Sequence, residues 1–162
     1  MDRIRDDQTL VIERNQNMVY RLARAGTGNR HDADDVFQEV FLRYIRKKPV
    51  FESPEHERNW FLRVTVNCTH TLMASFWKNR TEELSEDLAE DFDDLPVDAD
   101  DLRSALEKLD RRYRVVLHLF YYEELSAREI ADALRLRKSN VRMLLTRARR
   151  ALKTILEKEN AI

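Results

Sequence analysis

The chain has 162 residues, a net charge of −1 at pH 7, 43% hydrophobic and 36% charged residues. This length allows one ordinary domain or two small ones, and two glycines and three prolines in a chain rich in helix formers predict an all-α fold. A single cysteine, Cys68, excludes an intrachain disulfide and fits a reducing compartment. The N-terminal MDRIRDDQ lacks the apolar segment of a signal peptide, and no apolar run is long enough to span a bilayer. We therefore expect a cytoplasmic protein without membrane insertion.

Three helices are predicted in the first half of the chain. The first covers residues 7–25 and ends at the GTGN segment, where glycine can adopt the left-handed conformation of a helix C-terminus. Asp32 is the expected N-cap of the second, which extends to residue 47 before a proline. Ser53, followed by proline, is the expected N-cap of the third, which we extend to residue 80.

An acidic segment separates the two halves. Residues 81–101 contain eleven acidic residues and no basic residue, and such a block repels itself and lacks core-forming side chains. We expect a flexible linker at 81–98 between two small helical domains at 1–80 and 99–162.

The second half has the pattern of a helix-turn-helix. A helix is expected over residues 99–122, followed by a short helix over 127–134 that begins with a capping box of Ser126 and Glu129. A basic helix over residues 139–157 comes next. The segment around its start, RLRKSNVRMLLTRARRALK, holds eight cations and no acid, and a basic second helix of this motif fits the DNA major groove.

The polar residues of this basic helix are candidate DNA contacts. Guanidinium groups bind phosphates and guanine edges in bidentate fashion, and an asparagine can pair with adenine. The alternative is a solvated charged face on an ordinary bundle helix. The candidates are Arg137, Lys138, Ser139, Asn140, Arg142, Thr146, Arg147, Arg149 and Arg150.

Two further patterns in the first half have both a functional and a structural interpretation. Charged residues on the second helix could dock a partner helix or simply be solvated. The tryptophans and phenylalanines of the third helix could stack on unpaired bases or form the core. Catalytic and metal-binding patterns are not found: the four histidines lack ligand spacing, the acidic segment lacks the glycine of a calcium loop, and no glycine-rich phosphate loop is present. We expect that the protein is not an enzyme and that it binds no cofactor and no metal ion.

The ordered motifs resemble the extracytoplasmic-function class of bacterial RNA polymerase sigma factors over nearly the whole chain. DADDVFQEVFLRYIR resembles the region 2 helix that binds the β′ clamp helices of the polymerase, and NWFLRVTVN resembles the stretch that melts and reads the −10 element. LDRRYRVVLHLFYYEELSAREIADAL followed by VRMLLTRARRALK resembles region 4, which reads the −35 element and touches the β flap. The resemblance implies core polymerase, promoter DNA and an anti-sigma factor as partners.

The resemblance also assigns roles to single residues. Core polymerase binding falls to Asp35, Gln38, Glu39, Leu42 and Arg43. The loop over residues 49–56 would hold a flipped base, and the −10 contacts would be Phe51, Ser53, Trp60, Arg63, Asn67, Trp77 and Lys78. In the turn of the helix-turn-helix, Arg135 stands where the family usually has a glycine.

Two other classes of function remain open at this point. A stand-alone helix-turn-helix regulator would need only the second half, and a helical adaptor or anti-sigma mimic would not need the acid-free basic segment. The region from residue 32 to residue 80 distinguishes a sigma factor from the first alternative, and the acid-free segment from residue 135 to residue 153 distinguishes it from the second.

Overall fold

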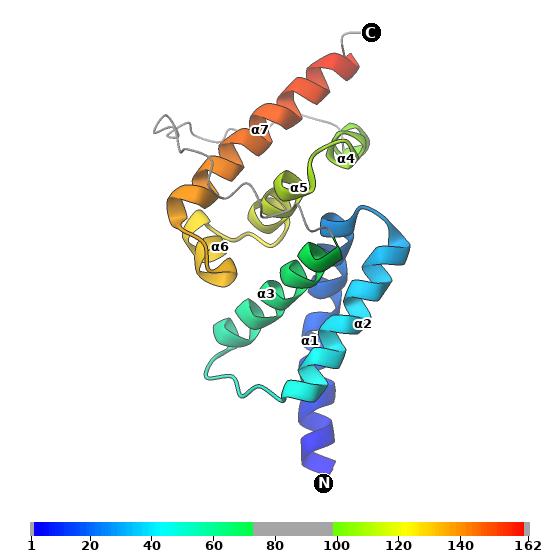
Figure 1. The fold of residues 1–162 in the computed structure, drawn as a ribbon, viewed down its shortest axis with the longest axis vertical. Coiled ribbons are helices and arrows are strands. Elements are labelled where there is room, and N and C mark those ends of the chain that lie inside the picture. Colours follow the sequence, from blue (N-terminus) through cyan, green and yellow to red (C-terminus); the bar gives the residue numbers. More distant parts are fainter. Residues whose placement is uncertain (1, 73–98, 161–162) are drawn as a thin grey trace. The chain divides into compact units, whose positions relative to one another are not determined.

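The computed structural model describes residues 2–72 and 99–160, and its chain divides into two compact units, Met1–Ser75 and Phe76–Ile162 (Figure 1). Every element of the described residues is helical, as the sequence predicts. The acidic segment at 81–98 and the last part of the predicted third helix lie outside the described residues. The domain boundaries at residues 80 and 98 stay predictions.

The first unit consists of three helices, α1 (Asp2–Thr27), α2 (Arg30–Lys47) and α3 (Pro54–Leu72), and each packs against the other two. Burial of one apolar stripe per helix drives this packing. Fully buried side chains come from all three helices: Val19, Leu22, Val36, Val40, Phe61, Leu62 and Val66.

The helix ends of this unit follow local chemistry. Gly28, at φ 81°, takes the left-handed conformation after α1, as predicted for the GTGN segment. Ser53 caps α3, because its Oγ accepts a hydrogen bond from the His56 N–H at 3.0 Å. The predicted N-cap of α2, Asp32, is wrong: Asn29 is the cap, and its side-chain oxygen accepts from the Asp32 N–H at 2.8 Å. Both residues are good caps, and the two-residue link after α1 starts the new helix earlier.

Helices α1 and α3 are in close contact at Gly26. A Cβ atom at this position would lie 2.7 Å from Cγ2 of Thr69, a side chain that is itself buried. A second contact joins Arg14 of α1 to Glu57 of α3. Arg14 lies twelve residues before Gly26, and Glu57 lies twelve residues before Thr69. Equal spacing in the same direction means that α1 and α3 run parallel, in register over about 18 Å.

We predict that Gly26→Ala destabilises the first unit by about 1–2 kcal/mol, because the overpacking cost exceeds the helix propensity gained. Thermal unfolding followed by circular dichroism measures the change. Adding Thr69→Ser, which removes Cγ2, should recover part of the loss. An unchanged or higher melting temperature for Gly26→Ala would show that the two helices can separate at no cost.

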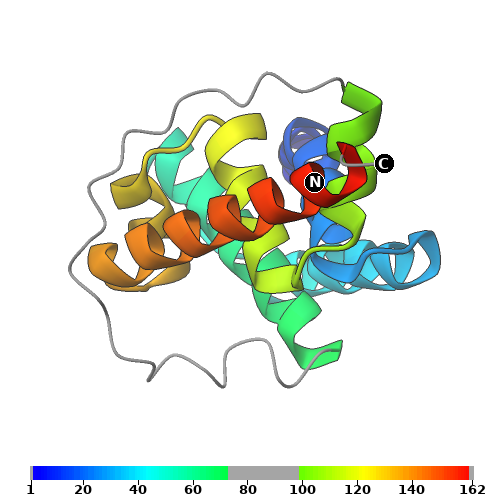
Figure 2. The ribbon, with the colours of Figure 1, turned by 90° about the horizontal axis from the view of Figure 1, so that it is seen from above.

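The second unit contains α4 (Ala99–Glu107), α5 (Arg111–Leu117), the π-helical turn η1 (His118–Tyr122), α6 (Ala127–Leu134) and α7 (Lys138–Asn160). Helix α7 packs against α4, α5 and α6, and it crosses these shorter helices in Figure 2. Its apolar face supplies a large share of the buried side chains, which include Val141, Leu144, Leu145, Ala148 and Leu152. Near its C-terminal end, Glu159 forms an ion pair with Lys108 after α4.

The prediction of one continuous helix over residues 99–122 is wrong. The chain turns at Lys108 and Leu109, whose N–H groups bond to carbonyls three residues back, and Asp110 then caps α5 by accepting from the Arg112 N–H at 3.0 Å. Aspartate competes well for such a position, because its carboxylate satisfies an amide that the helix cannot. Helical periodicity continues on both sides of the break, so it conceals the turn.

The helix-turn-helix is formed by α6 and α7. The predicted capping box of Ser126 and Glu129 is confirmed, with both reciprocal hydrogen bonds at 3.1 Å. Arg135 ends α6 in the left-handed conformation, at φ 56° and ψ 44°. The turn therefore keeps the backbone geometry that favours glycine, although an arginine occupies it.

We predict that Arg135→Gly raises the stability of the second unit by about 0.5–1 kcal/mol. Relief of the left-handed strain, about 1–2 kcal/mol for an L-residue, exceeds the extra entropy that glycine loses on folding. The melting temperature of the full chain gives the test, and Arg137→Gly is the matched control that loses the same charge without relieving strain. A lower melting temperature for Arg135→Gly than for the control would contradict this account of the turn.

Candidate functional site

The five residues to which the resemblance assigns polymerase binding share one exposed strip of α2. Asp35, Gln38 and Leu42 are exposed, and Glu39 and Arg43 are half-buried and form an ion pair of 3.0 Å. The opposite face of α2 is buried against α1 and α3. Leu42 is 46% exposed in the middle of these charges. An apolar side chain surrounded by charged groups of both signs suits the docking of a second helix.

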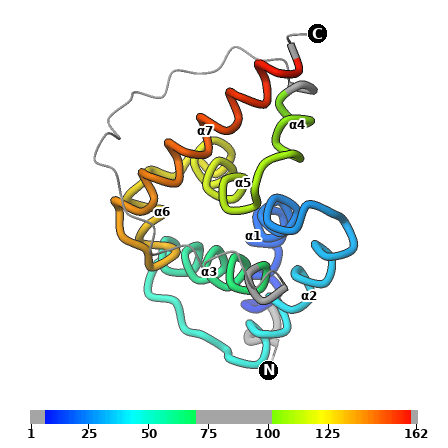
Figure 3. The backbone as a smooth tube through the Cα atoms, turned by 45° about the horizontal axis from the view of Figure 1, so that its top comes forward, coloured from blue at the N-terminus to red at the C-terminus, as the bar shows by residue number. Residues whose placement is uncertain are grey.

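The loop between α2 and α3 is anchored by Phe51. Figure 3 shows this segment passing from the end of α2 to the start of α3. The Phe51 ring stacks on Tyr44 at 6.3 Å between centroids and meets Trp60 at 5.9 Å and His56 at 5.5 Å, both edge-on. Phe51 is therefore half-buried and holds the loop against the rings of Tyr44, Trp60 and His56. Ser53 is exposed.

Hydrogen bonds fix the end of this loop next to α3. The Glu52 N–H donates to Nδ1 of His56 at 3.1 Å, and the His56 N–H donates to the Ser53 hydroxyl. At the other end, Lys48 caps α2 in the left-handed conformation. Val50, which is 86% exposed, projects from the segment between these anchors.

Three further −10 candidates lie along one face of α3. Trp60, Arg63 and Asn67 recur at helical spacing, with Trp60 and Arg63 half-buried and Asn67 exposed. Trp60 also packs edge-on against the fully buried Phe61, with ring centroids 4.9 Å apart. The structure thus joins the loop and this face of α3, while Trp77 and Lys78 lie outside the described residues.

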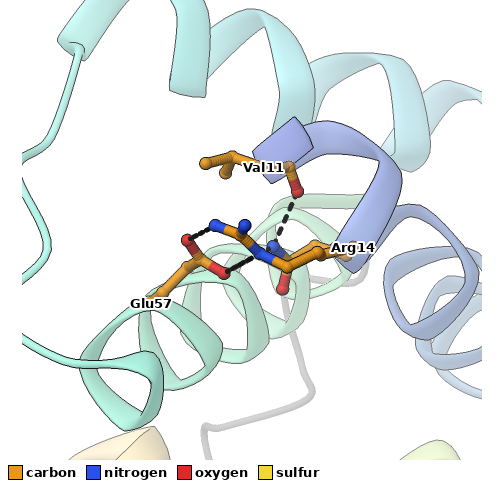
Figure 4. Close-up of polar contacts among 4 residues, drawn as sticks. Val11, Arg14 and Glu57 are labelled. Atoms are coloured by element: carbon orange, nitrogen blue, oxygen red, sulfur yellow. Dashed lines mark hydrogen bonds and ion pairs between the residues drawn. The ribbon is translucent and has the colours of Figure 1, made fainter. Parts of the chain in front are cut away.

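A polar network that the sequence does not reveal joins α1 to the start of α3 (Figure 4). Arg14 makes two hydrogen bonds to the Glu57 carboxylate, at 2.7 and 3.2 Å, and Asn15 donates a third at 3.2 Å. Asn15 also donates to the Val11 carbonyl at 2.8 Å. The side chain of Glu57 is only 12% exposed, so its charge is held by three donors.

The pKa of Glu57 is set by two opposing effects, burial and hydrogen bonding. Burial of the carboxyl opposes ionisation, but the hydrogen bonds from Arg14 and Asn15, with the positive charge of Arg14, outweigh it and lower the pKa. The carboxylate is therefore ionised at neutral pH and remains paired.

The −35 candidates surround the N-terminal half of α7. Arg137, Lys138, Ser139, Arg142 and Arg150 are exposed, and Asn140, Arg147 and Arg149 are half-buried. The buried face of α7 holds these side chains on the outside of the unit. Thr146 differs from the prediction, because it is 3% exposed and its side chain does not reach the surface in this structure.

One group of possible metal ligands is found among the described residues. His31, Asp32 and Asp35 have ligand atoms within 4.8 Å of one another at the start of α2. The group is largely exposed, and Asp32 already accepts a hydrogen bond from the Asn29 amide at 2.7 Å. Exposed acidic groups of this kind are common without an ion.

Comparisons with known proteins match both units. The family description "Sigma-70 region 2" matches residues 11–79, and "Sigma-70, region 4" matches residues 99–152. The ECF RNA polymerase sigma factor SigE of Mycolicibacterium smegmatis is 30% identical in an alignment 164 residues long, which covers 93% of this chain and 62% of that protein. The RNA polymerase sigma factor SigV of Bacillus subtilis is 29% identical over 154 residues, which cover 94% of this chain and 92% of that protein. The chain belongs to the extracytoplasmic-function class of RNA polymerase sigma factors.

A solved structure has the same fold. The sigma factor RpoE of Bartonella quintana, in complex with the anti-sigma factor NepR, aligns with a TM-score of 0.67 at 17% sequence identity and covers 97% of this chain and 98% of that one. Sigma factors of this class are initiation factors and not enzymes. The stand-alone helix-turn-helix regulator is not favoured, because the region 2 match covers most of the first unit.

The family matches also show where the candidate surfaces lie. The α2 strip, the loop and α3 fall within the region 2 match, and the helix-turn-helix falls within the region 4 match. Among the described residues, none of the helices combines the length and apolar character needed to cross a bilayer.

Proposed function

We propose that this sigma factor binds core RNA polymerase through the α2 strip and recognises promoters through two DNA-binding surfaces. The strip of Asp35, Gln38, Glu39, Leu42 and Arg43 would receive the β′ clamp helices. The exposed, charged strip on the first unit is the observation that carries this assignment, because its opposite face is the core of the unit. The protein would work in the cytoplasm, where polymerase and DNA are found.

The loop and α3 would capture the −10 strand as it opens. Unpaired bases can stack on aromatic rings, and stacking and polar contacts offset the pairing that is lost. The half-buried Trp60 leaves part of its indole accessible beside Arg63 and Asn67, which can contact the backbone of a strand. Phe51 would act through the loop that it anchors, and Ser53 through its exposed side chain.

The basic end of α7 would read the −35 element. Exposed guanidinium and ammonium groups around a helix N-terminus supply phosphate contacts, and Asn140 supplies a possible base contact. Region 4 would also touch the β flap, and an anti-sigma factor would control availability of the protein. The solved relative in complex with an anti-sigma factor supports that last proposal.

Transcription in vitro tests the function as a whole. We expect the purified protein, added to sigma-free core polymerase and a promoter library, to start transcripts at a restricted set of sites. Core polymerase alone is the control. Absence of any specific start across the library would refute the proposed function.

Charge reversal tests the α2 strip. Asp35→Arg should weaken binding to core polymerase about tenfold, which corresponds to about 1.4 kcal/mol, because it reverses one charge of an interface whose charges must complement those of the partner. The neighbouring Asp34→Arg has the same change in net charge outside the strip and serves as the control in a competition binding assay. Equal losses for the two variants would show that general charge, and not the strip, determines affinity.

A salt titration tests the basic end of α7. Arg142→Ala should weaken binding to duplex DNA with many different −35 sequences, and the slope of log K against log salt should fall by about one, as expected for one lost phosphate contact. Lys158→Ala, which removes an exposed cation from the last turn of the same helix, is the control. A loss confined to one DNA sequence would assign Arg142 to a base instead, and an unchanged affinity would remove it from the interface.

A further inference from the structure

The loop between α2 and α3 has few restraints of its own. Between Lys48 and Ser53 the backbone forms no regular element, and Val50 is almost fully exposed. Its order depends on the Phe51 ring contacts and on the hydrogen bonds that His56 makes with Glu52 and Ser53. The stacking of Phe51 on Tyr44 ties the loop to α2. The hydrogen bonds of Glu52 and Ser53 depend instead on where α3 begins, because His56 lies in its first turn.

Glu57 connects that first turn to α1. Its N–H donates to the Ser53 carbonyl at 3.1 Å, which closes the first backbone hydrogen bond of α3. Its carboxylate receives Arg14 and Asn15 from α1. One residue therefore links the body of the unit to the cap that ends the loop.

The chemistry of this link favours orientation over simple burial. A buried carboxylate costs desolvation energy, and an apolar residue could fill the same space without that cost. A bidentate guanidinium pair with a third donor instead fixes both the orientation of the carboxylate and its position along the helix axis. Such a contact suits a requirement for a definite loop geometry.

We propose that Glu57, held by Arg14 and Asn15, is a positioning residue for capture of the −10 strand. It fixes the start of α3, so that the loop and Trp60 are already arranged when a base leaves the duplex. The ordering entropy of the loop is then lost on folding and not on DNA binding, which strengthens the complex. This inference rests on the proposed function of the loop and α3.

Strand capture by Glu57→Gln is the first test. The sigma factor is bound to saturating core polymerase, and a promoter fragment carries 2-aminopurine in a pre-opened −10 segment. We expect about tenfold weaker capture by Glu57→Gln, with the affinity for core polymerase unchanged. Exchange of the two charges, Arg14→Glu with Glu57→Arg, should restore part of the loss because the pair re-forms in reverse.

A matched control separates positioning from stability. Thr27 lies at the other end of α1, where its buried hydroxyl donates to the Ala23 carbonyl at 2.7 Å, so Thr27→Val weakens the same unit away from the loop. Capture by Thr27→Val should stay at the wild-type level at a temperature where both variants are folded. An equal loss in Thr27→Val, or no loss in Glu57→Gln, would overturn the proposal.

Amide hydrogen exchange gives a readout without DNA. In Glu57→Gln the Glu52 and His56 amides should exchange about tenfold faster, while amides in the middle of α2 do not change. Unchanged exchange at these two amides would also overturn the proposal.

The variant Trp60→Ala distinguishes failure of the Glu57 proposal from failure of the proposed function. If Trp60→Ala loses capture and Glu57→Gln does not, the surface binds the strand but Glu57 does not position it. If neither variant changes capture, the loop and α3 are not the −10 surface, and both proposals fall together.

Discussion

The parallel alignment of α1 with α3 is the constraint on which the first unit depends. It is fixed at one end by a steric contact, in which Gly26 admits Thr69, and at the other by a charged contact, in which Arg14 holds Glu57. The steric contact sets how closely the helices approach, and the charged contact sets their register along the axis. With both settled, α3 must turn Phe61 and Leu62 into the core and leave Trp60, Arg63 and Asn67 along the outer face.

Helix ends could be predicted from the sequence where one short segment contains all the residues that determine them. The capping box at Ser126, the cap at Ser53 and the left-handed Gly28 each depend on a few neighbouring residues. Prediction failed where two local solutions compete. Asn29 and Asp32 are both good caps, and the turn before Asp110 interrupts an apolar pattern that continues across it.

In the candidate site, too, features set by local sequence could be predicted, and features set by distant contacts could not. Helical spacing correctly gathered the α2 strip on one exposed face, because spacing alone decides which side a residue occupies. The Arg14–Glu57 pair joins residues 43 positions apart, and nothing in either local segment signals it. Thr146 was expected among exposed polar residues of α7, yet it is buried, since helical periodicity ranks faces by polarity and takes no account of what packs on them.

Two cations, Lys48 and Arg135, occupy backbone conformations that glycine would adopt more easily. One begins the loop proposed for the −10 strand, and the other forms the turn before the helix proposed for the −35 element. Each costs the fold about 1–2 kcal/mol relative to an unstrained residue and places a positive charge at the edge of a candidate DNA surface. On the proposed function, these two positions favour electrostatic attraction to DNA over stability, so the most thermostable version of this chain would not be its most avid DNA binder. Glu124, the third non-glycine residue with a positive φ among the described residues, carries a negative charge and follows no such rule.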